Sequence, residues 1–223
     1  MNVTLIYLDN PFWRIELARI PLFIGDISFN DKRITLEEFR SAKETGFLKD
    51  GTKLPFHQIP CLVVDGVPIA QTGAIARFCG KLSGLYPSED SISCALIDQF
   101  IDFVTDLTNL VYIPSNSPLT EDEKIQHRRI LAEGELKRKL DMLEDNISVN
   151  QTWIVGKEMT IADIAIWRGI GWLASDLVAG IPQPYFVNYP KITKIFKNVD
   201  NHPKICEWVR KTYPSNYNRG YIE

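Results

Sequence analysis

The stretch that most constrains the fold of this chain spans residues 53–83, KLPFHQIPCLVVDGVPIAQTGAIARFCGKLS. Cys61–Val64 and Val67–Ala70 are two short apolar runs. The Asp65-Gly66 dipeptide between them favours a two-residue hairpin turn, because both central positions of that turn need a positive φ. A helical pattern follows the second run directly. The stretch therefore predicts an antiparallel strand pair that leads straight into a helix.

Distinctive residues stand at both ends of this hairpin. Proline cannot donate to a β ladder, so Pro60 suits the first position of a strand, and its bond to Ile59 can be cis. Gln71 and Thr72 stand where the helix begins, and the hydroxyl of Thr72 can cap free backbone amides. A helix N-terminus of this kind favours a bound carboxylate. The residues alone leave two interpretations open, a simple hairpin with a capped helix or half of a site for an anionic ligand.

Upstream of the hairpin, extended and helical patterns alternate. Val3–Leu8 predicts a buried strand, and the loop after it can cap a helix over about residues 12–25. Residues 27–33 predict a second strand and residues 35–43 a second helix. This order is typical of an α/β domain whose first two strands are parallel and are joined by a right-handed crossover. The polar residues 44–51 are expected to form a flexible flap.

Downstream, the composition changes to that of a linker over residues 84–90, GLYPSED, and the pattern beyond it is helical. Apolar residues with a 3-4-3-4 spacing predict a long helix over about residues 97–111. An acidic stripe runs along the same helix at Asp98, Asp102 and Asp106. Like charges at this spacing repel, so the stripe should face water or a cationic group. A second long helix is predicted over residues 132–147.

Capping signals mark the starts of the later helices. Thr120 is followed three residues later by a glutamate, and Thr160 is followed by Asp163, which is the spacing of a capping box. Pro190 and Pro203 each stand near the expected start of a final helix, where a proline costs no hydrogen bond. We expect all of these residues to serve folding.

Composition excludes several classes of function. The 223 residues, 45% of them hydrophobic and 24% charged, suit one large or two small globular domains. A net charge of −3 offers no basic surface for nucleic acid. No apolar run is long enough to span a bilayer and the N-terminus has no signal-like segment, so we expect a cytoplasmic protein. Four scattered cysteines and three histidines predict no metal site, and we expect reduced, buried thiols.

The motifs described above resemble those of the cytosolic glutathione transferases, in their Tyr-type group and most like the sigma class. The resemblance covers about residues 3–210. It implies a thioredoxin-like, glutathione-binding α/β domain over residues 1–83, a linker over residues 84–90, and an all-helical domain with the electrophile pocket over residues 91–223. It also implies a homodimer, with glutathione as co-substrate and no metal.

Carrying the family's motifs onto matching positions assigns the site. Tyr7, at the end of the first strand, corresponds to the catalytic tyrosine, although the loop that follows it is one residue longer than usual. Phe39 replaces a tryptophan of the family and so lacks its N–H donor. The implied glutathione-binding residues are Arg14, Phe39, Lys43, Gln58, Ile59, Pro60, Gln71, Thr72 and Asp106. The implied walls of the electrophile pocket are Phe12, Trp13 and Tyr112.

The resemblance implies a simple mechanism. A thiol is a poor nucleophile until it loses its proton, and its ordinary pKa is about 8.5. A hydroxyl that donates a hydrogen bond to sulfur favours the thiolate and so lowers that pKa. Tyr7 would act in this way on glutathione, and the thiolate would attack an electrophile bound beside it without a general base on the protein.

Other functions stay open at this point. The same thiolate could serve isomerisation, as in sigma-like members that isomerise prostaglandins, or peroxide reduction. Lens crystallins and an elongation-factor subunit use this fold in non-catalytic roles. Redox chemistry through a protein thiol is less expected, because the loop over residues 9–13 holds no cysteine. The identity of the electrophile does not follow from the sequence.

Overall fold

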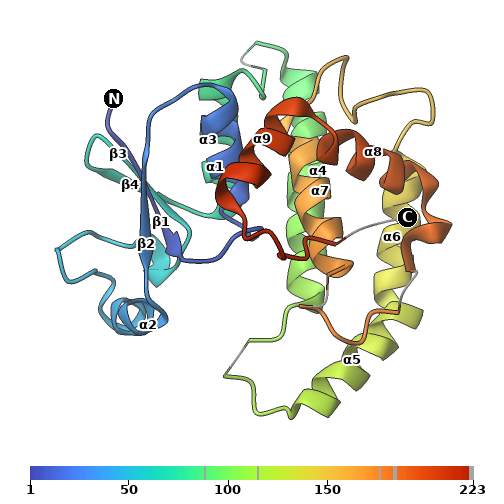
Figure 1. The fold of residues 1–223 in the computed structure, drawn as a ribbon, viewed down its shortest axis with the longest axis horizontal. Helices are drawn as coiled ribbons and strands as arrows, with labels where there is room; N and C mark the ends of the chain where they lie inside the picture. Colours follow the sequence, from blue (N-terminus) through green and yellow to red (C-terminus); the bar gives the residue numbers. More distant parts are fainter. Residues whose placement is uncertain (88, 115, 176, 183–184, 221–223) are drawn as a thin grey trace. The chain divides into compact units, whose positions relative to one another are not determined.

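A computed structural model of the chain describes residues 1–87, 89–114, 116–175, 177–182 and 185–220. The chain divides into two compact units, Met1–Ser91 and Ile92–Glu223, which are described separately (Figure 1). Ser88, inside the linker expected over residues 84–90, lies outside the described residues.

The first unit is built on a four-stranded sheet with the order β2-β1-β3-β4. Its strands are β1 (Val3–Leu8), β2 (Asn30–Ile34), β3 (Cys61–Val64) and β4 (Val67–Ala70). The pair β1–β2 is parallel, whereas β1–β3 and β3–β4 are antiparallel. This sheet and its helices confirm the predicted thioredoxin-like domain, including the parallel first crossover and the hairpin.

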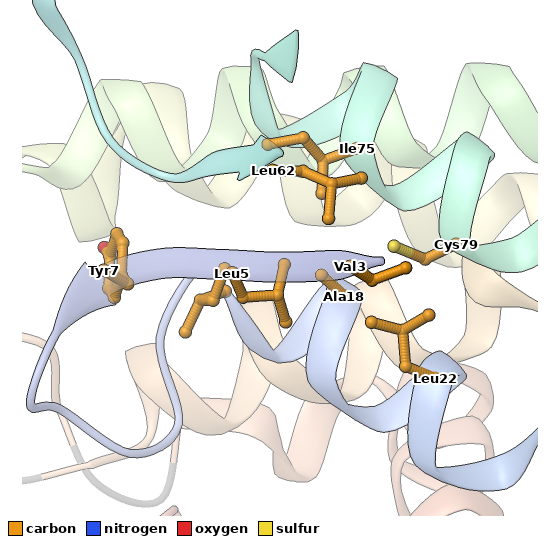
Figure 2. Packing of buried hydrophobic residues seen from close by; sticks show 9 residues of the cluster. Val3, Leu5, Tyr7, Ala18, Leu22, Leu62, Ile75 and Cys79 are labelled. Carbon is orange, nitrogen blue, oxygen red and sulfur yellow. The ribbon is translucent and has the colours of Figure 1, made fainter. Parts of the chain in front are cut away.

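Helices cover both faces of this sheet. Helices α1 (Glu16–Ile24) and α3 (Thr72–Ser83) lie side by side and pack against the strand residues Val3, Leu5 and Tyr7 (Figures 1 and 2). Helix α2 (Leu36–Thr45) packs on the opposite face of the sheet. The core there includes Ile6 of β1 and Cys61 of β3. A 3-10 turn, Pro55–His57, precedes β3. Because side chains on both faces of β1 are buried, its sequence is a continuous apolar run.

The expectations for the start of α1, the start of β2 and the segment 44–51 are wrong. Helix α1 begins at Glu16 and not near Phe12, because the chain first passes through a turn in which Phe12 has a left-handed φ of 52°. Strand β2 begins at Asn30, three residues later than predicted. The segment 44–51 is no loose flap, because Leu48 is buried in the core beside α2 and its N–H donates to the carbonyl of Thr52.

The second unit is helical, as predicted. Its described helices are α4 (Ser91–Val111), α5 (Glu121–Glu133), α6 (Glu135–Asn146), α7 (Ile161–Leu173), η2 (Tyr185–Asn188), α8 (Pro190–Asp200) and α9 (Pro203–Thr212). The predicted apolar stripe of α4 is buried. The single helix expected over residues 132–147 is wrong, because Gly134 at φ −117° and ψ −107° separates α5 from α6. The residues expected on its apolar face are nevertheless buried.

Helix α7 is the core of the second unit, and each of its thirteen residues is buried. Its start carries the predicted capping box. Both Oδ atoms of Asp163 accept hydrogen bonds, from the N–H of Ile154 at 2.8 Å and from the N–H and hydroxyl of Thr160 at 2.8 and 2.9 Å. Asp163 thus ties the preceding loop to the central helix and satisfies donors that burial removes from water.

We predict that the buried capping box contributes far more to stability than an exposed one. Asp163→Ala leaves two buried N–H groups and a hydroxyl without an acceptor, so it should lower the free energy of unfolding by about 3–5 kcal/mol. Glu123→Ala removes the equivalent hydrogen bonds from the exposed capping box at Thr120 and should lower the free energy of unfolding by about 1 kcal/mol. Urea unfolding of both variants measures the difference, and equal costs would contradict this account.

The contribution of Asp163 should also depend on pH. Burial raises the pKa of Asp163 to about 6, against about 3.9 in an unfolded chain. Between these values the folded state holds a proton that the unfolded state has released. This residue's contribution to the free energy of unfolding should therefore decrease, by up to about 3 kcal/mol, as pH rises from about 4 to about 6. The stability difference between wild type and Asp163→Ala should be larger at pH ~4 than at pH ~7, and the reverse order would show that the three donors outweigh burial.

Candidate functional site

The register of the sheet brings three predicted site residues to one edge. Paired residues on three adjacent strands form one row of the sheet, Ile6, Cys61 and Ala70. Tyr7, Pro60 and Gln71 are the residues that extend this row at the same end of β1, β3 and β4. Neighbouring strands lie about 4.8 Å apart, so the three positions span about 10 Å. That is close to the length of an extended tripeptide.

Tyr7 marks one end of this row. Figure 2 shows its side chain at one end of β1, whereas Val3 and Cys79 lie at the other end of this strand. The ring is only 3% exposed and packs in the core that α1 and α3 cover. Packing of this kind fixes the ring's orientation, which a hydroxyl that acts on a ligand atom requires.

The middle of the row is the entrance to β3. The Ile59–Pro60 bond is cis, which confirms the expectation from the sequence. Ile59 is half-buried and packs against the cores on both faces of the sheet, whereas the side chain of Gln58 is exposed. The main chain at Ile59 therefore lies between two well-packed regions.

The far end of the row is the start of α3. Gln71 is the N-cap residue, with φ 74° and ψ 121°, and no side chain caps the helix. The expectation that Thr72 caps α3 is wrong, because Thr72 is already the first helical residue. Amides in the first turn of a helix carry partial positive charge and accept an anion readily. A non-glycine residue with positive φ costs free energy, and such residues occur at turns and at functional sites.

Helix α2 carries two more predicted binding residues. Lys43 is exposed in its last turn, and its carbonyl lies 3.0 Å from Nδ1 of His57, which links α2 to the turn before β3. Phe39 is half-buried against the core under α2, so its ring contributes packing as well as surface. The roles of both residues in binding a ligand stay predictions.

The loop after β1, the helix α4 and the residue that follows α4 are the places of the remaining predicted residues. Phe12 is fully buried, and the guanidinium of Arg14 lies 6.0 Å from the ring centroid of Trp13. Asp106 and Tyr112 are exposed residues of the second unit. The roles of these two residues in binding stay predictions.

The buried thiols of the first unit are poor nucleophiles. Burial raises the pKa of Cys61 to about 11 and that of Cys79 to about 12, so both are protonated at neutral pH. This argues against redox chemistry at Cys61, although it adjoins Pro60. The expectation that every thiol is buried is wrong for Cys206, which is exposed, and for Cys94, which is half-buried.

Metal binding and membrane insertion are two further possibilities for the described part of the chain. Among those residues, no group of three or more His, Cys, Asp or Glu side chains is arranged to hold a metal ion. No helix in the same residues is long and apolar enough to cross a membrane.

Sequence reasoning missed two features of this site. The left-handed backbone of Gln71 has no signal in its residue type, because the position usually favours glycine. The ion pairs of Arg19 with Glu16 and Asp31 were missed as well, although an arginine within the apolar stripe of α1 is a signal for a buried charge that needs a partner.

The fold defines a class of protein, a thioredoxin-like unit joined to a helical unit. Residues 3–80 match the family description "Glutathione S-transferase, N-terminal domain", and residues 105–212 match "Glutathione S-transferase, C-terminal domain".

Individual relatives agree with this match. The chain is 30% identical to Glutathione S-transferase 2 of Caenorhabditis elegans over 174 residues, 76% of this chain and 88% of the relative. It is 26% identical to hematopoietic prostaglandin D synthase of Gallus gallus, over 89% of this chain and 90% of that one. A solved structure of rat hPGDS with a quinoline has the same fold, with a TM-score of 0.79 and 23% identity over 97% of this chain and 100% of that one. The chain therefore belongs to the glutathione S-transferase family, as its sequence motifs predicted.

The backbone of Gln71 gives a test that needs no ligand. Because glycine has no Cβ, Gln71→Gly should be more stable than Gln71→Ala by about 1–2 kcal/mol in urea unfolding. Gln58, with an ordinary extended backbone of φ −131° and ψ 158°, is the matched control. There the order should reverse, with the glycine variant less stable by about 0.5–1 kcal/mol. The same order at both positions would contradict strain at Gln71.

Proposed function

We propose that this protein is a glutathione transferase that conjugates the thiolate of glutathione to small hydrophobic electrophiles. The observation that carries the proposal is the row of Tyr7, Pro60 and Gln71 at one edge of the sheet, in a chain that belongs to this family. Family membership and the names of the relatives support the transferase activity, and the row supports the place where glutathione is held.

In this proposal glutathione lies extended along the row. Its γ-glutamyl carboxylate binds the uncapped amides at the start of α3, with Gln71 and Thr72 beside it. The cysteinyl part pairs with the main chain at Ile59, between Gln58 and Pro60. The glycine end reaches the exposed ammonium of Lys43, near Phe39. These contacts place the thiol at the end of the row that Tyr7 occupies.

Tyr7 has the catalytic role in the proposal, and Arg14 is one of the glutathione-binding residues. The hydroxyl of Tyr7 donates a hydrogen bond to sulfur, so the thiol loses its proton to solvent more readily. The thiolate then forms a carbon–sulfur bond with the electrophile, whose leaving group departs with the bonding electron pair. Phe12, Trp13 and Tyr112 are the proposed walls around that electrophile.

Further features of the proposal follow the family and not a contact within the chain. We place the protein in the cytoplasm as a homodimer with a role in detoxification, closest to the sigma class. Asp106 of a second copy would meet the α-amino group of glutathione across the dimer interface. The proposed domain limits are residues 1–83 and 91–223, with a linker over residues 84–90, and no metal takes part.

A second candidate function is glutathione-dependent isomerisation or peroxide reduction at the same site. The observation that favours it is the likeness to a prostaglandin D synthase, at 26% identity over 89% of this chain. Both functions need the same thiolate and differ only in the second substrate. Assays of one protein preparation with an activated aryl chloride, an organic hydroperoxide and a prostaglandin endoperoxide distinguish them.

The proposed role of Tyr7 predicts a loss of turnover without a loss of binding. A hydrogen bond to a charged group is worth about 1.5–3 kcal/mol, so Tyr7→Phe should lower kcat for an activated aryl chloride about tenfold to a hundredfold. The KM for glutathione should change little, because the row is intact. Tyr189→Phe is the control, since it removes a hydroxyl that donates to Asp141 in the second unit and is not part of the proposed site. Wild-type turnover in Tyr7→Phe would refute this role.

A further inference from the structure

A series of hydrogen bonds between acidic and basic side chains joins strand β2 to helix α1 and to the loop after β1. Asp31 on β2 is its centre, and the two oxygens of this carboxylate have different partners. Oδ1 accepts from Nε of Arg19 at 3.0 Å, and Oδ2 accepts from Nε of Arg33 at 2.9 Å. One carboxylate thus orients two guanidinium groups at the same time.

The first of these groups holds the loop from inside. Arg19 is 1% exposed, and its Nη1 donates to the carbonyl of Asn10 at 3.1 Å and to Glu16 at 3.3 Å. A buried arginine is stable only when carboxylates and carbonyls satisfy it, so its position is tightly determined. The main chain at Asn10 is therefore fixed to a buried group of α1.

The second group holds the loop from outside. Nη1 of Arg33 donates to the carboxylate of Asp9, the first residue of the loop. In the parallel register, Asp31 pairs with Leu5 and Arg33 pairs with Tyr7. Paired residues of neighbouring strands share a face of the sheet, so both charged residues lie on the face that carries Tyr7.

The loop that these two arginines hold is the one that carries the proposed chemistry. It leads from Tyr7 to α1 and contains Trp13 and Arg14. It also takes Phe12 through a left-handed conformation. Holding an irregular segment in one conformation costs conformational entropy, so the correct placement of this loop needs attachments.

We propose that Asp31 is a positioning residue for catalysis. Through Arg19 and Arg33 it fixes the main chain at Asn10 and the side chain of Asp9, and so holds Arg14 and Trp13 in place beside the thiol that Tyr7 activates. This inference rests on the proposed function and extends it to residues that never touch glutathione. Displacement of catalytic groups by about 1 Å can cost two orders of magnitude in rate, so such attachments matter for turnover.

The test compares three carboxylates of the same unit. Asp31→Asn removes the shared charge, and Asp9→Asn removes only the outer attachment at an exposed residue, so it should leave folding intact. Asp50→Asn is the matched control, because Asp50 pairs with Lys32, whose neighbour in the register is Ile6 and which therefore lies on the opposite face of β2. Asp9→Glu keeps the carboxylate and tests rescue.

Steady-state kinetics with glutathione and an activated aryl chloride over a range of pH give the readout. Asp31→Asn should lower kcat/KM for the aryl chloride about tenfold or more and raise the apparent pKa of its pH profile by about one unit, with the KM for glutathione nearly unchanged. Asp9→Asn should move both quantities in the same direction by less, Asp9→Glu should restore them, and Asp50→Asn should match wild type.

The outcomes separate this inference from the proposed function. If wild type conjugates glutathione but folded Asp31→Asn and Asp9→Asn keep its pH profile and kcat/KM, the inference is wrong and the proposed function stands. If Asp31→Asn does not fold, unchanged kinetics in Asp9→Asn overturn the inference by themselves. If wild type neither binds nor conjugates glutathione, the proposed function fails and the inference fails with it.

Discussion

The register of three antiparallel strands is the constraint on which the candidate site depends. Pairing of Ile6 with Cys61 and of Cys61 with Ala70 sets Tyr7, Pro60 and Gln71 at one edge of the sheet. A slip by one residue would turn every side chain of a strand to the other face. Two different cores hold the register, one under α1 and α3 and one under α2. The residues that fix the fold therefore also fix the spacing of the three positions that would bind an extended ligand.

Helix starts show where this protein departs from ordinary stabilisation. Helices α2, α5 and α7 each begin with a reciprocal capping box. Helix α3 begins with no side-chain cap, as α1, α6, α8 and α9 do, and it differs from them because its N-cap residue, Gln71, has a left-handed backbone. Departures from local rules are expected where function requires them. The left-handed N-cap of α3 is consistent with amides kept for an anionic ligand, while the hydrogen bonds of Asp163 stabilise the start of α7.

Local signals made much of the fold predictable. The Asp65-Gly66 turn, the proline before β3 and the box at Thr160 act within a few residues, so sequence alone identified them. Long-range effects were not predictable in the same way. The loop after β1 looked like a helix cap, yet it is held by arginines that come from α1 and β2. The break at Gly134 and the position of Thr72 inside α3 likewise depend on how the chain packs. Of the candidate site, the row at the sheet edge was predictable, and its charged supports were not.

The most direct test of the central claim, that glutathione is bound and ionised at this sheet edge, is an ultraviolet difference titration of the protein with glutathione against pH. The account predicts a thiolate absorption band with an apparent pKa well below the value of about 8.5 for a free thiol. Glutathione that binds but titrates as it does in water would contradict activation at Tyr7. Failure of glutathione to bind at all would contradict the site itself.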